Sequence, residues 1–194
     1  MTTSLRIAIA DDEPEMQEFL EMALEQLGHE VVVQASNGKE LVKQCREMQP
    51  DLVITDIRMP DMDGLQAVAQ LRTSQPVPVI LVSGYSDPEY VEAALQNHVL
   101  AYLIKPIKSA HLHPAISLVM QRYKEFEALQ RQTDDLRQAL NDRKVIERAK
   151  GILMTRTGLS ESDAFKRLQL LSSQKNTKLA QIAEMIVTAE EAMA

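Results

Sequence analysis

The 194-residue chain has little of what several common classes of site require. It contains one cysteine, Cys45, no tryptophan, and only 4% aromatic residues. A single cysteine excludes an intramolecular disulfide and a cysteine-rich metal cluster, and it fits a reducing compartment. We expect Cys45 to pack on a helix as a small apolar side chain. The histidines lack the carboxylate or cysteine neighbours of a metal site.

Long apolar runs are also missing. No apolar segment approaches the roughly 20 residues that a membrane-spanning helix needs. Residues Met1 to Ala10 run directly into a predicted strand, without the pattern of a cleavable signal peptide. We therefore expect a soluble, cytoplasmic protein with no membrane partner.

The net charge of −7 is spread unevenly. Residues 1–140 carry 12 Lys and Arg against 21 Asp and Glu, a balance of −9, whereas residues 141–194 carry nine against seven, a balance of +2. This distribution disfavours nucleic-acid binding over the whole surface and confines any basic surface to the tail.

Short β-rich runs alternate with amphipathic stretches between residues 5 and 107. Strands are predicted at Leu5–Ala10, Val31–Gln34, Leu52–Thr55, Val77–Val82 and Ala101–Ile104, and helices at Pro14–Leu27, Gly38–Met48, Gly64–Arg72 and Asp87–Gln96. The nearly continuous apolar character of the strands is typical of a sheet covered on both faces. The alternation predicts an α/β fold with a doubly wound, five-stranded parallel sheet.

The segment from Ala115 to Leu140 has no glycine or proline and is rich in charged residues and glutamine. Its apolar positions follow steps of four and three, with one extra three-residue step after Phe126; they are Leu112, Ile116, Val119, Tyr123, Phe126, Leu129, Thr133, Leu136 and Leu140. This spacing predicts a long coiled-coil helix with a local phase break. An amphipathic helix that packs on its own domain is the alternative. Pro114 would occupy the first turn of this helix or kink it.

The tail is predicted to form a small all-α domain of three helices. The first spans Arg143–Thr157 and stops at Gly158, the second spans Glu161–Gln174 with Ser160 as its N-cap, and the third is capped by Thr177. Such short helices must pack on one another and on the preceding helix to be stable. The sequence predicts a first domain over residues 1–120, a linker helix over residues 115–142, and a second domain over residues 141–194.

Polar side chains follow directly after the predicted strands. They are Asp11, Asp12, Asp56, Ser83 and Lys105. Each alone has a plain explanation as a turn, a helix start or a strand exit. Doubly wound sheets, however, bind ligands outside the carboxyl ends of their strands, so the set together predicts one site.

These residue types suit transfer of a phosphoryl group to a carboxylate. Asp56 is repelled by an incoming phosphate unless a cation such as Mg²⁺, which takes oxygen ligands, lies between them. Asp11 and Asp12 can support that ion, together with a backbone carbonyl just after Asp56. The Lys105 ammonium and the Ser83 hydroxyl can donate to the phosphoryl oxygens.

Residues 5–120 resemble the receiver domain of two-component response regulators. The motifs that carry the resemblance are Ala10-Asp11-Asp12-Glu13, Thr55-Asp56-Ile57-Arg58-Met59-Pro60 with Asp63-Gly64, Val82-Ser83-Gly84, and Tyr102-Leu103-Ile104-Lys105-Pro106. One departure is His98-Val99, where receivers often have Gly-Ala before the tyrosine; it affects the turn before the last strand.

The receiver resemblance implies a role for each residue of the site. It implies that a sensor histidine kinase phosphorylates Asp56, and that Asp11, Asp12, Asp56 and the backbone carbonyl of Arg58 hold Mg²⁺. It also implies that Ser83 and Lys105 contact the phosphoryl group and that Ser83 and Tyr102 form a switch. Such a protein is no enzyme beyond phosphoryl transfer to, and hydrolysis from, its own aspartate.

Residues from about Leu136 to Ala189 resemble the ANTAR family of RNA-binding antitermination modules. The motifs are the run from Arg143 to Met154, then Gly158-Leu159-Ser160-Glu161, Ala164-Phe165, Leu168, Lys178-Leu179 and Ile182-Ala183. The resemblance implies a dimer that binds paired RNA hairpins of a nascent transcript. The RNA-binding candidates are Arg143, Lys144, Arg148 and Lys150, although a basic helix strip is also common as a solvated face.

The combined prediction is a phosphorylation-dependent response regulator that acts by RNA-binding transcription antitermination. Phosphorylation would bias Ser83 and Tyr102 and shift the long helix toward a homodimer. Two alternatives stay open. A helix-turn-helix in the tail would make the chain a DNA-binding transcriptional regulator, although the last helix continues into Glu190 and Glu191. The coiled coil could instead make it a protein-binding signalling adaptor.

Overall fold

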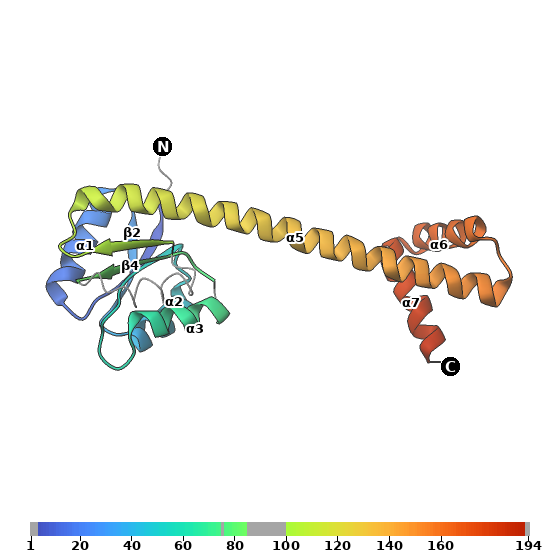
Figure 1. Cartoon of the computed structure of the whole chain (residues 1–194), viewed down its shortest axis with the longest axis horizontal. Helices are drawn as coiled ribbons and strands as arrows, with labels where there is room; N and C mark the ends of the chain where they lie inside the picture. Colours follow the sequence, from blue (N-terminus) through green and yellow to red (C-terminus); the bar gives the residue numbers. More distant parts are fainter. Residues whose placement is uncertain (1–3, 75, 85–99, 193–194) are drawn as a thin grey trace. The chain divides into compact units, whose positions relative to one another are not determined.

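The computed structural model describes residues 4–74, 76–84 and 100–192. The chain forms two compact units, Met1–Phe126 and Glu127–Ala194, and Figure 1 shows the order of their elements. The helix predicted at Asp87–Gln96 and the His98-Val99 pair lie outside the described residues. Among the residues described, no helix combines the length and the apolar character that a membrane crossing requires.

Unit 1 contains the predicted parallel sheet. Its strands are β1 (Arg6–Ala10), β2 (Glu30–Ala35), β3 (Leu52–Asp56), β4 (Val79–Ser83) and β5 (Ala101–Ile104). All neighbouring strands pair in parallel, in the order β2-β1-β3-β4-β5. This is the strand order of a doubly wound sheet with its switch point between β1 and β3. The predicted fold class is confirmed.

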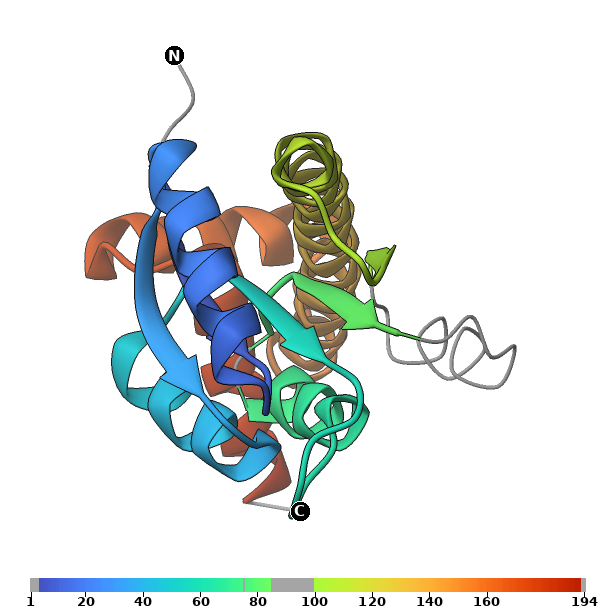
Figure 2. The ribbon, with the colours of Figure 1, turned by 90° about the vertical axis from the view of Figure 1, so that its left-hand side faces the viewer.

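Alternate residues of each strand face two separate apolar cores. Ala8 and Ala10 point toward α2 (Gly38–Met48) and α3 (Gly64–Ser74), whereas Ile7 and Ile9 point toward α1 (Pro14–Gln26) and the start of α5 (Ser109–Thr157). Figure 2 shows these helices on the two sides of the sheet. Helices on both faces explain why the central strands β1, β3 and β4 are apolar and buried on consecutive positions.

The helix ends of unit 1 follow local sequence signals. Asn37 caps α2, its side chain accepting a hydrogen bond from the Glu40 N–H at 3.0 Å. Gly28 ends the α1 region with a φ of +85°, a conformation that favours glycine. Helix α1 has no side-chain N-cap; it begins with Pro14 at its first position.

The structure corrects the coiled-coil prediction for the first part of α5. The first part of the seam is core of unit 1, because Leu112, Ile116 and Val119 are buried against β-strand residues. The Tyr123 hydroxyl then donates a hydrogen bond to the Pro76 carbonyl at 3.0 Å. The phase break noted after Phe126 in the sequence coincides with the end of unit 1. The first part of the apolar stripe thus belongs to the core of unit 1, as the packing alternative anticipated.

Beyond this boundary the stripe faces solvent. Leu129, Leu136 and Leu140 are 63%, 66% and 61% exposed. Leucines recurring with three- and four-residue steps on an exposed helix are typical of a coiled-coil seam. The second half of the seam is therefore available for association.

Unit 2 packs α6 (Glu161–Lys175) and α7 (Leu179–Glu191) on the last part of α5 around a small core; its buried residues are Ala149, Leu168, Ile182 and Ala183. The first predicted tail helix is the end of α5, which is continuous from Ser109. Ser160 caps α6 as predicted, its hydroxyl oxygen accepting from the Asp163 N–H at 3.2 Å. Thr177 as the cap of the last helix is wrong: Lys178 holds that position without a side-chain bond, and the Thr177 hydroxyl donates to Lys175.

His29 makes the stability of unit 1 sensitive to acid. It is buried, and its Nδ1 accepts a hydrogen bond from the Leu5 N–H at 3.3 Å. Burial, and secondarily His113, lowers the pKa of His29 below its usual 6.5. The unfolded chain therefore binds this proton more readily than the folded chain does. The stability contributed by neutral His29 is present above pH 6.5 and is lost as the pH falls below it.

We predict that His29→Asn, whose side-chain oxygen can accept from Leu5, flattens this dependence. The measurement is the free energy of unfolding in urea at pH 7.5 and pH 5.5 for both proteins. The wild type should lose more stability between the two pH values than the variant. Equal losses would contradict this account of His29.

Candidate acidic site at the carboxyl edge of the sheet

Strand register brings the predicted site residues to one edge. Ala10 pairs with Thr55, so Asp11 and Asp56 are the next residues on neighbouring strands. The Lys105 N–H donates to the Ser83 carbonyl at 2.8 Å. Four side chains far apart in the sequence thus leave adjacent strands at the same end.

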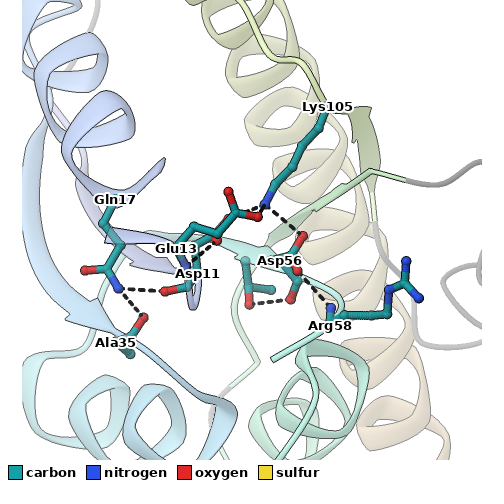
Figure 3. Close-up of polar contacts among 8 residues, drawn as sticks. Asp11, Glu13, Gln17, Ala35, Asp56, Arg58 and Lys105 are labelled. Atoms are coloured by element: carbon teal, nitrogen blue, oxygen red, sulfur yellow. Dashed lines mark hydrogen bonds and ion pairs between the residues drawn. The ribbon is translucent and has the colours of Figure 1, made fainter. Parts of the chain in front are cut away.

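Lys105 lies at the centre of this edge (Figure 3). Its Nζ atom is 2.8 Å from Asp11 Oδ2, 3.5 Å from Asp56 Oδ1 and 3.5 Å from Glu13 Oε1. The carboxylates of Asp11 and Asp56 are almost fully buried. Two buried negative charges at adjacent strand ends repel each other, and the Lys105 ammonium compensates both.

The surroundings shift the proton affinities of this group. Burial raises the pKa of Asp56; Lys105 opposes the rise, and Asp11 adds to it. Burial also acts against charged Lys105, but Asp11, Asp56 and Glu13 outweigh it and raise the pKa of Lys105. The ammonium stays charged at neutral pH, and the carboxylate of Asp56 is poorly solvated, which favours its use as a nucleophile.

The backbone around Asp56 is held from two sides. The Arg58 N–H donates to Asp56 Oδ2 at 2.9 Å, and the Thr55 hydroxyl donates to the Asp56 carbonyl at 3.0 Å. Helix α3 then starts so close that a Cβ on Gly64 would lie 2.0 Å from the Asp56 carbonyl oxygen. Glycine at position 64 is therefore required for the turn that presents Asp56.

The acidic residues at this edge fit a hard divalent cation. Carboxylate oxygens of Asp11, Asp12 and Glu13 all lie within 4.8 Å of one another. Asp11 Oδ2 is buried, and among the described residues its partner is the Lys105 ammonium at 2.8 Å. Carboxylates clustered at one edge of a sheet are suited to Mg²⁺, which prefers oxygen ligands.

The structure thus brings Asp11, Asp12, Asp56 and Lys105 together, with Ser83 at the neighbouring strand end. The Arg58 carbonyl as a metal ligand stays a prediction. Tyr102 is half-buried against the core on the α2 and α3 side, and its switch role also stays a prediction.

Two residues of this edge were not assigned a role from the sequence. Glu13 was visible as the third acid of its run, and the structure places it in the acidic cluster and near Lys105. Gln17, one turn into α1, contacts the loop that carries Asp11. No sequence signal pointed to Gln17, because its contact depends on how α1 leaves the sheet.

The four RNA-binding candidates on α5 have different surroundings. Arg143 and Lys144 are exposed, and within the described residues they form no ion pair. Arg148 is paired with Glu191 of α7 at 2.9 Å. The remaining candidate, Lys150, is only 8% exposed.

Lys150 holds unit 2 together. Its ammonium is 2.9 Å from Glu147 and 2.8 Å from Glu161 of α6, and it lies 6.0 Å from the centre of the Phe165 ring. These hydrogen bonds raise the pKa of Lys150 and lower that of Glu161. A lysine engaged in this way joins α5 to α6 and has little freedom to follow a phosphate backbone, so the geometry counts against it as an RNA contact.

Comparison with known proteins agrees with this architecture. The family model described as the response regulator receiver domain matches residues 7–117, and the model of the ANTAR domain matches residues 134–187. The chain belongs to the response regulators. Its receiver domain includes the acidic edge, and its ANTAR domain includes the helical core of unit 2, so both resemblances stated from the sequence are confirmed.

Relatives of this response regulator differ in how much of it they cover. The transcriptional regulatory protein PdtaR of Mycobacterium tuberculosis (strain H37Rv) is 36% identical over 182 residues, which span 94% of this chain and 89% of PdtaR. The regulatory protein AtoC of Escherichia coli is 34% identical over 142 residues, which span 73% of this chain and 30% of AtoC.

Solved structures match about three-fifths of the chain. A DNA-binding response regulator of the LuxR family from Staphylococcus aureus aligns with a TM-score of 0.57 and 30% identity, covering 60% of this chain and 98% of that one. The response regulator domain of Thermotoga maritima CheB aligns with a TM-score of 0.58 and 27% identity, covering 61% and 98%.

We predict that Gly64→Ala and Gly151→Ala change stability in opposite directions. The first substitution drives a methyl group into the Asp56 carbonyl and should cost about 1–3 kcal/mol or more. The second places a methyl group inside α5 with nothing described within 4 Å and should add about 1 kcal/mol through helix propensity. Urea unfolding followed by circular dichroism measures both; a neutral Gly64→Ala would contradict the close approach to Asp56.

Proposed function

We propose that this protein is a phosphorylation-dependent response regulator in which Asp56 accepts a phosphoryl group from a sensor histidine kinase. The observation that carries the proposal is the buried Asp56 carboxylate, 3.5 Å from Lys105 at the edge where the acidic cluster of a receiver domain lies. A poorly solvated carboxylate beside a fixed cation can attack phosphorus, and the same cation can then stabilise the transferred charge.

Each side chain has a defined part in this transfer. An Asp56 oxygen forms the new P–O bond as the P–N bond to the kinase histidine breaks, and the imidazole nitrogen keeps the electron pair. Lys105, already placed between Asp11 and Asp56, and the Ser83 hydroxyl donate to the phosphoryl oxygens.

The acidic cluster complements these donors. Asp11, Asp12, Asp56 and the Arg58 carbonyl would hold Mg²⁺, which supplies charge neutralisation between the carboxylate and the phosphoryl oxygens. Hydrolysis of the acyl phosphate by water releases inorganic phosphate and returns Asp56 to its carboxylate form.

We predict that Asp56→Asn abolishes phosphoryl uptake from a small donor such as acetyl phosphate in the presence of Mg²⁺. The amide cannot act as the nucleophile. Asp61→Asn is the matched control, because Asp61 is an exposed acid five residues away with a φ of +66°, which asparagine also adopts readily. Intact-mass spectrometry should show an added phosphoryl group on the wild type and on Asp61→Asn; uptake by Asp56→Asn would refute the assignment.

The exposed leucines of α5 support association with a second copy of this chain. Leu129, Leu136 and Leu140 lie at heptad spacing on one stripe, and each is more than three-fifths exposed. A seam of this kind gains most of its stabilisation when an identical seam covers it. We infer a homodimer through α5, with phosphorylation changing its population or its geometry.

We predict that Leu136→Lys weakens self-association, because it places a charge in the seam. Gln138→Lys adds the same charge two residues away, on the opposite side of the helix, and should leave association unchanged. Analytical ultracentrifugation, with and without Mg²⁺ and beryllofluoride, measures both variants. Equal association of Leu136→Lys and wild type in both conditions would refute the seam.

We propose RNA as the target of the ANTAR domain, with transcription antitermination as the output. Support comes from Arg143 and Lys144, whose charges are exposed and not paired with a carboxylate among the described residues. By contrast, the end of α7 is acidic, and its Glu190 and Glu191 already pair with Arg156 and Arg148. Helix α7 itself contains no lysine or arginine, so it lacks the basic side chains that a recognition helix presents to the major groove of DNA.

We predict that Arg143→Ala with Lys144→Ala weakens binding to RNA hairpins chosen from transcripts that co-purify with the chain. The slope of log affinity against log salt should fall by about 0.7–0.9 for each phosphate that the variant no longer neutralises. Arg131→Ala, which removes an exposed charge from the linker part of α5, is the control. Preference for duplex DNA would favour the DNA-binding alternative, and binding of neither nucleic acid would favour the adaptor.

A further inference from the structure

Gln17 joins the acidic loop to the neighbouring strand. Its side-chain Nε2 donates to the Asp11 carbonyl at 2.6 Å and to the Ala35 carbonyl at 3.1 Å (Figure 3). Only the NH₂ end of the amide can donate to two carbonyls, so these contacts settle which way the amide faces. The Asp11 N–H also donates to the Ala35 carbonyl at 3.1 Å. Gln17, Asp11 and Ala35 therefore form a closed set of hydrogen bonds at the end of β1 and β2.

The loop between β1 and α1 needs this connection. Helix α1 has no side-chain N-cap, and the loop consists of Asp11, Asp12 and Glu13 alone. The three carboxylates, with one oxygen from each within 4.8 Å of the others, repel one another and tend to spread the loop, and Lys105 offsets only part of this repulsion, at Asp11 and Glu13. Gln17 opposes that spreading from inside the helix by holding the backbone between β1 and α1.

The hydrogen bonds of Asp11 show which atoms of the loop Gln17 holds in place. Its Oδ1 accepts from the Glu13 N–H at 3.0 Å, and its carbonyl accepts from Gln17. Its Oδ2 is buried, and its partner among the described residues is the Lys105 ammonium at 2.8 Å. The carbonyl of Asp11 belongs to the peptide that joins it to Asp12, so the bond from Gln17 fixes the direction in which both carboxylates leave the backbone.

We infer that Gln17 is a positioning residue that sets the affinity of the acidic edge for Mg²⁺, because it orients Asp11 and Asp12, two of the ligands proposed above. This inference rests on the proposed function of the acidic edge as the metal site of the receiver. Residues that orient the ligands of a metal typically change its affinity by about 10–100-fold when removed, because ligands that are not pre-organised must be ordered when the ion binds.

The test is Mg²⁺ binding by isothermal titration calorimetry to the full chain, without any phosphodonor. Gln17→Met keeps the length of the side chain and removes its donors, and the dissociation constant should rise about tenfold. Gln17→Glu also removes the donors but adds a negative charge near the site. Charge alone predicts tighter Mg²⁺ binding for Gln17→Glu, whereas the loss of positioning predicts weaker binding.

Gln26→Glu is the matched control. It makes the same change of charge as Gln17→Glu, but Gln26 is exposed and lies at the far end of α1. Its Mg²⁺ affinity should equal that of the wild type. Wild-type affinity in Gln17→Met, or tighter binding in Gln17→Glu, would overturn the inference even if the melting temperature changes. If Gln17→Met does not fold, Gln17→Glu decides. Failure of the proposed function would appear in a different experiment, as a wild-type protein that takes up no phosphoryl group on Asp56.

Discussion

The structure depends on the compensation of two buried carboxylates by one ammonium at the edge of a parallel sheet. Asp11 and Asp56 leave adjacent strands side by side, and their repulsion would destabilise this edge without Lys105. This ion pairing can be exchanged, because an ammonium that balances two carboxylates can equally balance the charge of a phosphoryl group. The proposed function as a phosphoryl acceptor requires this property, because the edge must be stable both before and after transfer.

Much of this arrangement could be predicted from the sequence because it follows from short-range rules. Apolar runs bounded by turn residues predicted all five strands. The polar residues at the ends of these runs predicted that Asp11, Asp56, Ser83 and Lys105 lie at one edge. The contacts of Gln17 and Lys150 could not be predicted. Both bridge separate elements, and helical spacing does not reveal which side chain lies between them. Thr177 failed as a cap because its hydroxyl bonds back to Lys175 instead of to the next helix.

Helix α5 shows how one pattern can serve two structures. Its apolar stripe is receiver core up to Val119 and an exposed seam from Leu129, and the extra three-residue step in the sequence marks the change. Spacing alone located the break but did not say which half was buried in its own domain. The helix is continuous from Ser109 in unit 1 to Thr157 in unit 2, so no loop separates its packed first half from the seam. This continuity supports the proposed link between Asp56 and association through α5.

The central claim is that Asp56 carries the phosphoryl group. The most direct measurement is reduction of the phosphorylated wild-type chain with borohydride, which converts an acyl phosphate to an alcohol, followed by peptide mass spectrometry. The account predicts homoserine at position 56 and unmodified aspartate at positions 11, 12, 61 and 63. Reduction at any of those four positions, with Asp56 intact, would contradict it.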